Sequence, residues 1–87
     1  MKTVVIVPAY NEESNIRSVV TNVKRCCPQA DIVVVNDGSS DRTGQVARES
    51  GATVVLDLPV NVGIGGAVQT GYLYAERNGY DIAVQLD

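Results

Sequence analysis

Apolar positions along the chain alternate between short continuous runs and longer stretches with helical spacing. Four runs rich in β-branched residues predict strands over residues 3–7, 32–35, 53–58 and 81–87, and the first two lack polar alternation, as expected of strands covered on both faces. Between the runs, apolar residues recur every three or four positions, which predicts amphipathic helices. The predicted order is therefore β-α-β-α-β-α-β.

Turn-forming and capping residues set the limits of these elements. We expect Pro8 to end the first strand and Asn11 to cap the next helix, with the two glutamates that follow it in the first helical turn. Ser40 or Asp41 is placed to cap the second helix, and Gly79 is placed to terminate the third.

Strands that alternate with helices need right-handed crossovers, which predicts a doubly wound parallel α/β sheet with helices on both faces. Ligands of such sheets bind outside the carboxyl ends of the strands, where the strand order reverses. If the strands run in the order 3-2-1-4, the loop after Val7 faces Asp87, with the loop around Asp37 beside it. We therefore expect a binding crevice between the ends of the first and fourth strands.

Composition and charge narrow the possible functions. The 87 residues are 45% hydrophobic and 20% charged, which fits part or all of one globular domain. Seven basic against ten acidic residues give a net charge of −3, which argues against nucleic acid as a partner. No apolar run reaches the roughly 18 residues of a membrane span, and no signal peptide is evident, so we expect a cytoplasmic location.

Cysteine and histidine usage excludes several kinds of chemistry. Cys26 and Cys27 are adjacent, no other cysteine is present, and the chain contains no histidine. A zinc site of the usual Cys/His type and a histidine-dependent catalytic triad are therefore excluded. We expect both cysteines to be reduced bystanders.

The loop after the first strand carries residues suited to a planar, hydroxyl-rich ligand. Pro8 stiffens the strand exit, Ala9 is small enough to let a planar group approach the backbone, and Tyr10 offers an aromatic face and a hydroxyl. Glu12 can accept hydrogen bonds from a sugar or a base. A plain strand-to-helix turn explains the same residues equally well.

Two aspartates end strands at the expected crevice. Asp37 follows the second strand, where an acidic group can accept from ribose hydroxyls or a base N–H, although an ordinary Asx turn is the alternative. Asp87 ends the fourth strand, and a carboxylate there suits a divalent cation on diphosphate oxygens. A single carboxylate makes an incomplete metal site.

The glycines before the third helix do not form a dinucleotide fingerprint. Gly63, Gly65 and Gly66 follow the third strand instead of the first, and Val68 stands where another glycine belongs. A loop packed closely on the sheet explains part of this pattern. The open helix start near Gly65 could also attract a phosphate.

Four segments together resemble the N-terminal half of a family 2 glycosyltransferase. They are VVIVPAYNEESNI, IVVVNDGSSDRT, NVGIGGAVQTGY and YDIAVQLD, and they cover essentially the whole chain in order. The resemblance implies the GT-A fold, a Rossmann-like doubly wound sheet, here truncated after its fourth strand. The pattern is most similar to polyprenyl- and dolichyl-phosphate sugar transferases.

The resemblance also implies roles for individual residues in binding a UDP- or GDP-linked sugar. It places the base and ribose among Pro8, Ala9, Tyr10, Glu12 and Asp37, with Gly65 in the supporting glycine loop. Asp87 matches the first aspartate of a metal-binding D-x-D motif that holds Mg2+ or Mn2+ on the diphosphate. One departure is Ile64, because many relatives carry lysine there.

The implied reaction is an inverting transfer of the sugar to a hydroxyl or lipid-phosphate acceptor, by a full-length enzyme that could associate with membranes. In the family, the catalytic base and acceptor site lie downstream of Asp87, so we expect residues 1–87 alone to be inactive. We also expect this fragment to self-associate through its fourth strand or the helix before it.

Two other functions remain open from the sequence. A sugar nucleotidyltransferase has a related sheet, but its glycine-rich basic signature follows the first strand, where this chain has VPAYNEE. A non-catalytic nucleotide-binding or assembly module would suit the short length.

Overall fold

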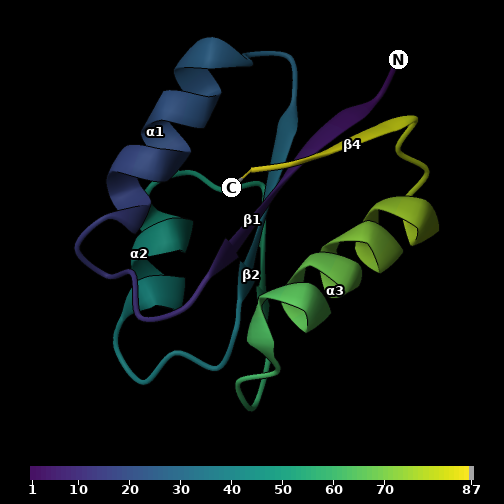
Figure 1. The fold of residues 1–87 in the computed structure, drawn as a ribbon. Helices are drawn as coiled ribbons and strands as arrows, with labels where there is room; N and C mark the ends of the chain where they lie inside the picture. Colours follow the sequence, from purple (N-terminus) through teal and green to yellow (C-terminus); the bar gives the residue numbers. More distant parts are fainter. Residues whose placement is uncertain (87) are drawn as a thin grey trace.

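The chain folds into a parallel sheet with helices on both faces, in a computed structural model that describes residues 1–86 (Figure 1). The elements follow the predicted order: β1 (Thr3–Ala9), α1 (Ile16–Cys26), β2 (Asp31–Asn36), α2 (Thr43–Glu49), β3 (Val54–Asp57), α3 (Gly63–Arg77) and β4 (Ile82–Gln85). The strands lie in the order β3-β2-β1-β4, and all three pairings are parallel. This confirms the predicted sheet and its 3-2-1-4 order.

Alternate residues of the central strands build two separate cores, because successive side chains point to opposite faces of a sheet. One face packs against α1 and α2, and the other packs against α3, as Figure 1 shows. The first core contains Val5, Val7, Ala9, Ile16, Val20, Val23, Ile32, Val34 and Ala47. The second contains Val4, Ile6, Val33, Val35, Ala67 and Ala75.

The helix α3 approaches the sheet closely at Gly71. A Cβ atom built on Gly71 would lie 2.4 Å from Cγ2 of Ile6, so any side chain there would push the helix away from β1. This close approach positions the start of α3 beside the carboxyl ends of β1 and β2.

Pro8 does not end β1, so that expectation is wrong: the strand continues through Pro8. The carbonyl of Ile6 faces the β4 side, where it accepts from Leu86 N at 2.9 Å. Residues two apart in a strand direct their backbone groups to the same side, so the nitrogen of Pro8 faces the β4 side as well. Among residues 1–86, the β1–β4 pairs run from Thr3 with Ile82 to Ile6 with Gln85. Pro8 lies beyond these described pairs, so its missing N–H removes no ladder bond from them.

The expected cap of the first helix is also wrong. α1 begins at Ile16 and has no acidic residue in its first turn. Asn11 lies outside the helix with φ +51°, and its Oδ1 accepts from Ser40 N at 2.8 Å. This partner, 29 residues away in sequence, takes the side chain that was expected to cap the helix. The predicted cap of α2 by Ser40 or Asp41 is wrong as well, because the N-cap residue is Arg42 and no side chain caps this helix. Asp41 Oδ1 accepts from Thr43 N at 3.0 Å, as in an Asx turn just before the helix.

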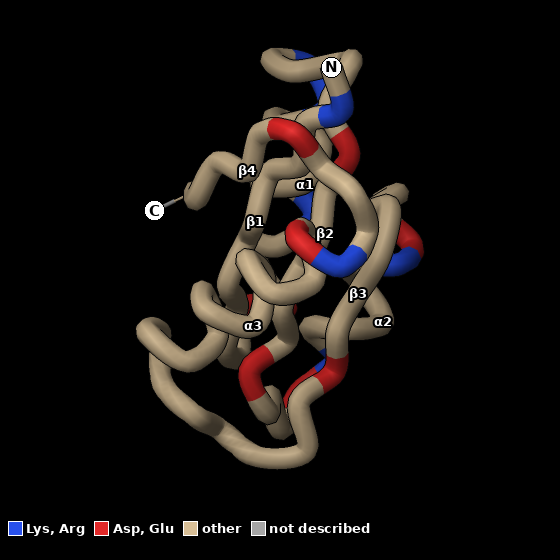
Figure 2. The backbone as a smooth tube through the Cα atoms, turned by 90° about the vertical axis from the view of Figure 1, so that its right-hand side faces the viewer, with Lys and Arg blue, Asp and Glu red and all other residues tan. Residues whose placement is uncertain are grey.

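The residues at the start of α3 carry no charge. From residue 58 to residue 75 the chain has no Asp, Glu, Lys or Arg, and this part is tan in Figure 2. Among residues 1–86, no helix has the length and apolar character that crossing a bilayer would require.

Candidate nucleotide site

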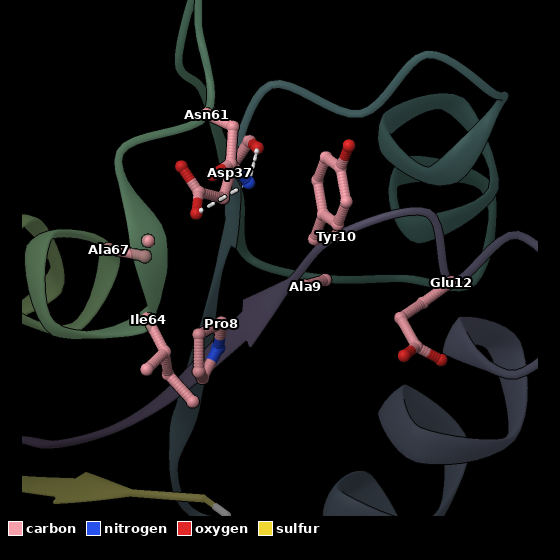
Figure 3. Close-up of a pocket in the computed structure, with 9 residues that line it drawn as sticks. Pro8, Ala9, Tyr10, Glu12, Asp37, Asn61, Ile64 and Ala67 are labelled. Atoms are coloured by element: carbon pink, nitrogen blue, oxygen red, sulfur yellow. Dashed lines mark hydrogen bonds between the residues drawn. The ribbon is translucent and has the colours of Figure 1, made fainter.

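A cavity of about 330 Å3 lies at the carboxyl ends of β1 and β2, beside the start of α3 (Figure 3). Three segments that are distant in sequence line it: Pro8, Ala9, Tyr10 and Glu12 from the end of β1, Asp37 from the end of β2, and Asn61, Gly63, Ile64 and Ala67 from the start of α3. The cavity thus brings together five of the residues that the sequence predicted for nucleotide binding.

Asp37 is the most buried polar residue of the cavity, with only 3% of its surface exposed. Its backbone N–H donates to Ala9 O at 2.8 Å, which fixes the end of β2 to the end of β1. Its Oδ1 accepts from Val62 N at 2.7 Å, and its Oδ2 accepts from Asn61 Nδ2 at 3.2 Å. A carboxylate offers about four acceptor positions, so these two bonds leave capacity for donors on a ligand.

Gly38 lets the β2 loop pass directly against the loop before α3. Its φ is +69°, and a Cβ atom there would lie 2.4 Å from Asn61 N. A side chain would therefore be both strained in backbone conformation and in collision with the neighbouring backbone. The close contact brings Asn61 within reach of Asp37.

Tyr10 and Glu12 lie on the other wall of the cavity. The Tyr10 ring stands across from Asp37 in Figure 3, and half of the residue's surface is exposed (50%). An aromatic ring in this position presents its face to a planar ligand. The Glu12 side chain lies toward α1 in Figure 3, and its Oε2 accepts from Asn15 Nδ2 at 3.1 Å.

A second hollow of about 190 Å3 adjoins the first on the α1 side of β1. Pro8, Ala9 and Glu12 line both hollows, and Leu86 lines the second. The end of the described β4 segment therefore lies at the same edge of the sheet as the cavity.

The remaining predicted site residues lie differently. Gly65 is exposed in the first turn of α3 but does not line the cavity, whereas its neighbours Gly63 and Ile64 do. Asp87, predicted for nucleotide and metal binding, lies outside the described residues. Residues 1–86 contain no group of three acidic, cysteine or histidine residues that could hold a metal ion.

Sequence reasoning missed Asn61 and Val62 as partners of Asp37. Asn61 lies in the loop between β3 and α3, and nothing in its immediate sequence marks a contact with a residue 24 positions earlier. The available signal was indirect: a buried aspartate after a strand needs donors, and the next loop along the sheet edge is the nearest source.

A comparison with protein families matches residues 4–84 to the family described as "Glycosyl transferase family 2". Among curated proteins, the chain is 37% identical over 91 residues to a polyprenol monophosphomannose synthase from Mycolicibacterium smegmatis, covering 99% of this chain and 34% of that protein. It is 32% identical to an undecaprenyl-phosphate mannosyltransferase from Micrococcus luteus, covering 100% of this chain and 37% of that protein. The chain thus spans about a third of the length of these relatives.

Solved structures show the same similarity in three dimensions. The chain resembles glucosyl-3-phosphoglycerate synthase from Mycobacterium tuberculosis in complex with Mn2+, UDP and glucosyl-3-phosphoglycerate, with TM-score 0.76, 31% identity, and coverage of 99% of this chain and 33% of that one. It also resembles that enzyme in complex with Mg2+ and UDP, with TM-score 0.75, 32% identity, and coverage of 99% and 32%. The fold, the sequence match and the relatives agree: the chain belongs to glycosyl transferase family 2.

Proposed function

We propose that residues 1–87 form the N-terminal, nucleotide-sugar-binding part of a GT-A glycosyltransferase. The observation that carries this proposal is the meeting of Tyr10 and Asp37, from two separate loops, on one cavity at the carboxyl edge of a parallel sheet. Such an edge is where ligands bind in this class of sheet. The similar synthase structures that contain UDP support a nucleoside diphosphate as the ligand.

In this proposal, each wall of the cavity contacts a different part of the donor. Tyr10 stacks on the base over the small Ala9, and the free acceptor positions of Asp37 receive N–H or O–H groups of the base or ribose. Pro8 and Glu12 bound the ribose side, and the helix start around Gly65 lies on the diphosphate side. The base is uracil or guanine.

We propose that Asp87 provides one ligand to a Mg2+ or Mn2+ ion on the diphosphate. Oxygen ligands suit these ions, and the similar synthase structures contain Mn2+ or Mg2+ together with UDP. The described residues contain no cluster of carboxylates that could hold the metal. The Asp37 carboxylate already accepts a hydrogen bond from Val62 N, next to the start of α3. Residues 1–86 therefore do not complete the metal site, and we assign the catalytic base to none of them.

The proposed reaction of the whole enzyme is transfer of the sugar to a lipid phosphate or a hydroxyl. The two mannosyl-transferring relatives, named for polyprenol and undecaprenyl phosphate, favour a lipid-phosphate acceptor. The glucosyl-3-phosphoglycerate in the synthase structure favours a small hydroxyl compound as the acceptor. We propose a cytoplasmic location for the reaction, a reducing compartment in which exposed thiols such as Cys26 and Cys27 stay free.

Calorimetry with UDP and GDP, each with and without Mn2+, tests the proposal. We expect one of the two nucleotides to bind the wild-type chain, and Tyr10→Ala to weaken that binding by about tenfold, since base stacking on an aromatic ring is worth about 1–3 kcal/mol. Tyr72→Ala is the matched control, because Tyr72 is similarly exposed (42%) but lies on α3 outside the cavity. Absence of binding by either nucleotide, or equal effects of the two substitutions, would contradict the proposal.

We also propose that the chain self-associates through β4. This strand is the outermost one on its side of the described sheet, and Ile82 and Val84 are 39% and 48% exposed. A groove of about 340 Å3 runs beside it toward α1, lined by Val5, Val19, Asn22, Val23, Cys26, Cys27, Val84 and Leu86. Because the groove carries no charge, a second copy can cover it without like-charge repulsion, and the same strip on both copies suits a twofold contact.

A further inference from the structure

The turn that follows β1 is joined by a row of hydrogen bonds to residues 39–43, the end of the loop before α2 and the first residue of that helix. Three successive backbone N–H groups of the turn donate to side-chain oxygens of this segment: Asn11 to Ser39 Oγ at 2.9 Å, Glu12 to Thr43 Oγ1 at 2.8 Å and Glu13 to Asp41 Oδ2 at 3.3 Å. The loop also donates back, since Ser40 N bonds to Asn11 Oδ1 at 2.8 Å. The cavity residues Tyr10 and Glu12 therefore stand on a turn whose backbone is held by a different segment.

The turn contains one residue in an uncommon backbone conformation. Asn11 has φ +51°, in the left-handed region that costs most non-glycine residues about 1–2 kcal/mol and that asparagine tolerates better than most. The bonds to residues 39–43 offset that cost. Loss of these bonds should therefore loosen the backbone that carries Tyr10 and Glu12.

Thr43 is the buried centre of this contact. It is 0% exposed, whereas Asp41 is exposed to solvent. Its hydroxyl accepts from Glu12 N and donates to Asp41 Oδ1, so its donor and one acceptor position are both used. The hydrogen bond from the Thr43 hydroxyl holds the pKa of Asp41 below its ordinary value, so the carboxylate stays ionised and keeps accepting from Thr43.

We propose that Thr43 is a positioning residue of the nucleotide cavity, because its buried hydroxyl holds the backbone of Glu12 and with it the wall that carries Tyr10. This inference rests on the proposed nucleotide-binding function. Thr43 touches the turn and not the ligand, so it acts through Glu12. The role requires the hydroxyl and not the methyl group.

Thr43→Val tests this role, because valine keeps the shape and removes the hydroxyl. We expect the Kd for UDP, or for GDP if that nucleotide binds, to rise about fivefold, the equivalent of one net hydrogen bond. Thr43→Ser should restore the wild-type Kd. The matched control is Thr53→Val: Thr53 Oγ1 accepts from Ile32 N, also at 2.8 Å, but at the opposite end of the strands. That substitution should leave the Kd unchanged.

Amide hydrogen exchange, followed by NMR on the unliganded chain, separates this inference from the proposed function. Thr43→Val should speed exchange of the Glu12 amide on the order of tenfold and leave the Ile32 amide unchanged, and Thr53→Val should do the reverse. If no nucleotide binds the wild-type chain, the proposed function fails. The exchange rate of the Glu12 amide in Thr43→Val then still tests whether Thr43 holds the turn.

The inference is overturned if Thr43→Val keeps both Glu12 exchange and nucleotide affinity within twofold of wild type, or if Thr53→Val weakens nucleotide binding equally. Should Thr43→Val fail to fold, Asp41→Asn tests the same link at an exposed position. We expect this substitution, too, to speed exchange of the Glu12 amide. Unchanged exchange would count against the role of the Thr43 hydroxyl and its bond to the Asp41 carboxylate.

Discussion

Replacing Asp37 by alanine should destabilise the fold as well as the cavity. The carboxylate accepts from Val62 N at 2.7 Å and from Asn61 Nδ2 at 3.2 Å, and Asp37 is 3% exposed. Hydrogen bonds to a charged group contribute about 1.5–3 kcal/mol each. Because Asn61 and Val62 are exposed and water can reach them after the substitution, we expect a total loss of about 2–3 kcal/mol instead of the full sum of both bonds.

Urea unfolding followed by circular dichroism at neutral pH measures this loss, and a double-mutant cycle assigns it. The Asn61 side chain donates to the backbone carbonyl and to the carboxylate of Asp37. Asp37→Ala and Asn61→Ala should therefore be non-additive, with a coupling free energy of about 1 kcal/mol.

Asp81→Ala is the matched control for burial. Asp81 Oδ2 also accepts a backbone N–H, from Lys2 at 2.8 Å, but the site is exposed. We expect that substitution to cost no more than about 0.5 kcal/mol. If Asp37→Ala costs no more than Asp81→Ala, or if the Asp37 and Asn61 effects simply add, the argument that Asp37 fastens the start of α3 is refuted.

Three further outcomes follow from the structure. Gly38→Ala should cost about 2–3 kcal/mol in urea unfolding, because φ is +69° and the new Cβ would lie 2.4 Å from Asn61 N; a loss under about 0.5 kcal/mol would contradict the close contact. Burial, with help from the hydrogen bond to Asp31, raises the pKa of Tyr80 from 10.0 to about 12. The unfolded chain therefore loses this proton first, so stability should fall as the pH rises from about 10 towards 12, and Tyr80→Phe should lessen that fall in unfolding measured across the range. Val84→Lys should shift the chain to monomer in sedimentation experiments, since it places a charge in the apolar groove beside β4; a wild-type chain that is already monomeric at high concentration would contradict self-association.

The sheet could be predicted from the sequence because its signals are local. Continuous runs such as residues 32–35 specify a buried strand, and the alternation of strands and helices leaves few topologies. The limits of the elements were less predictable. Pro8 lies within β1, and whether a proline is tolerated there depends on the pairing with a neighbouring strand, which the local sequence does not specify.

The candidate site was predictable only in part, for the same reason. Tyr10 and Asp37 follow strands whose carboxyl ends meet at one edge, so the topology alone brings them to one cavity. Asn61 and Thr43 could not be found this way, because their roles depend on side-chain contacts with residues 24 and 31 positions away. For Asn11, the local sequence favours a helix cap, but in the structure its side chain accepts a hydrogen bond from Ser40 N instead.

The proline in β1 has a consequence for how the sheet opens at this edge. The nitrogen of Pro8 carries no hydrogen, so it cannot donate a hydrogen bond to the carbonyl of a strand on the β4 side. Beyond Ile6, such a strand would therefore gain one hydrogen bond fewer from β1. On the other side of β1, pairing with β2 continues through Pro8 and Ala9, so these two residues stay in the sheet while they line both hollows at this edge.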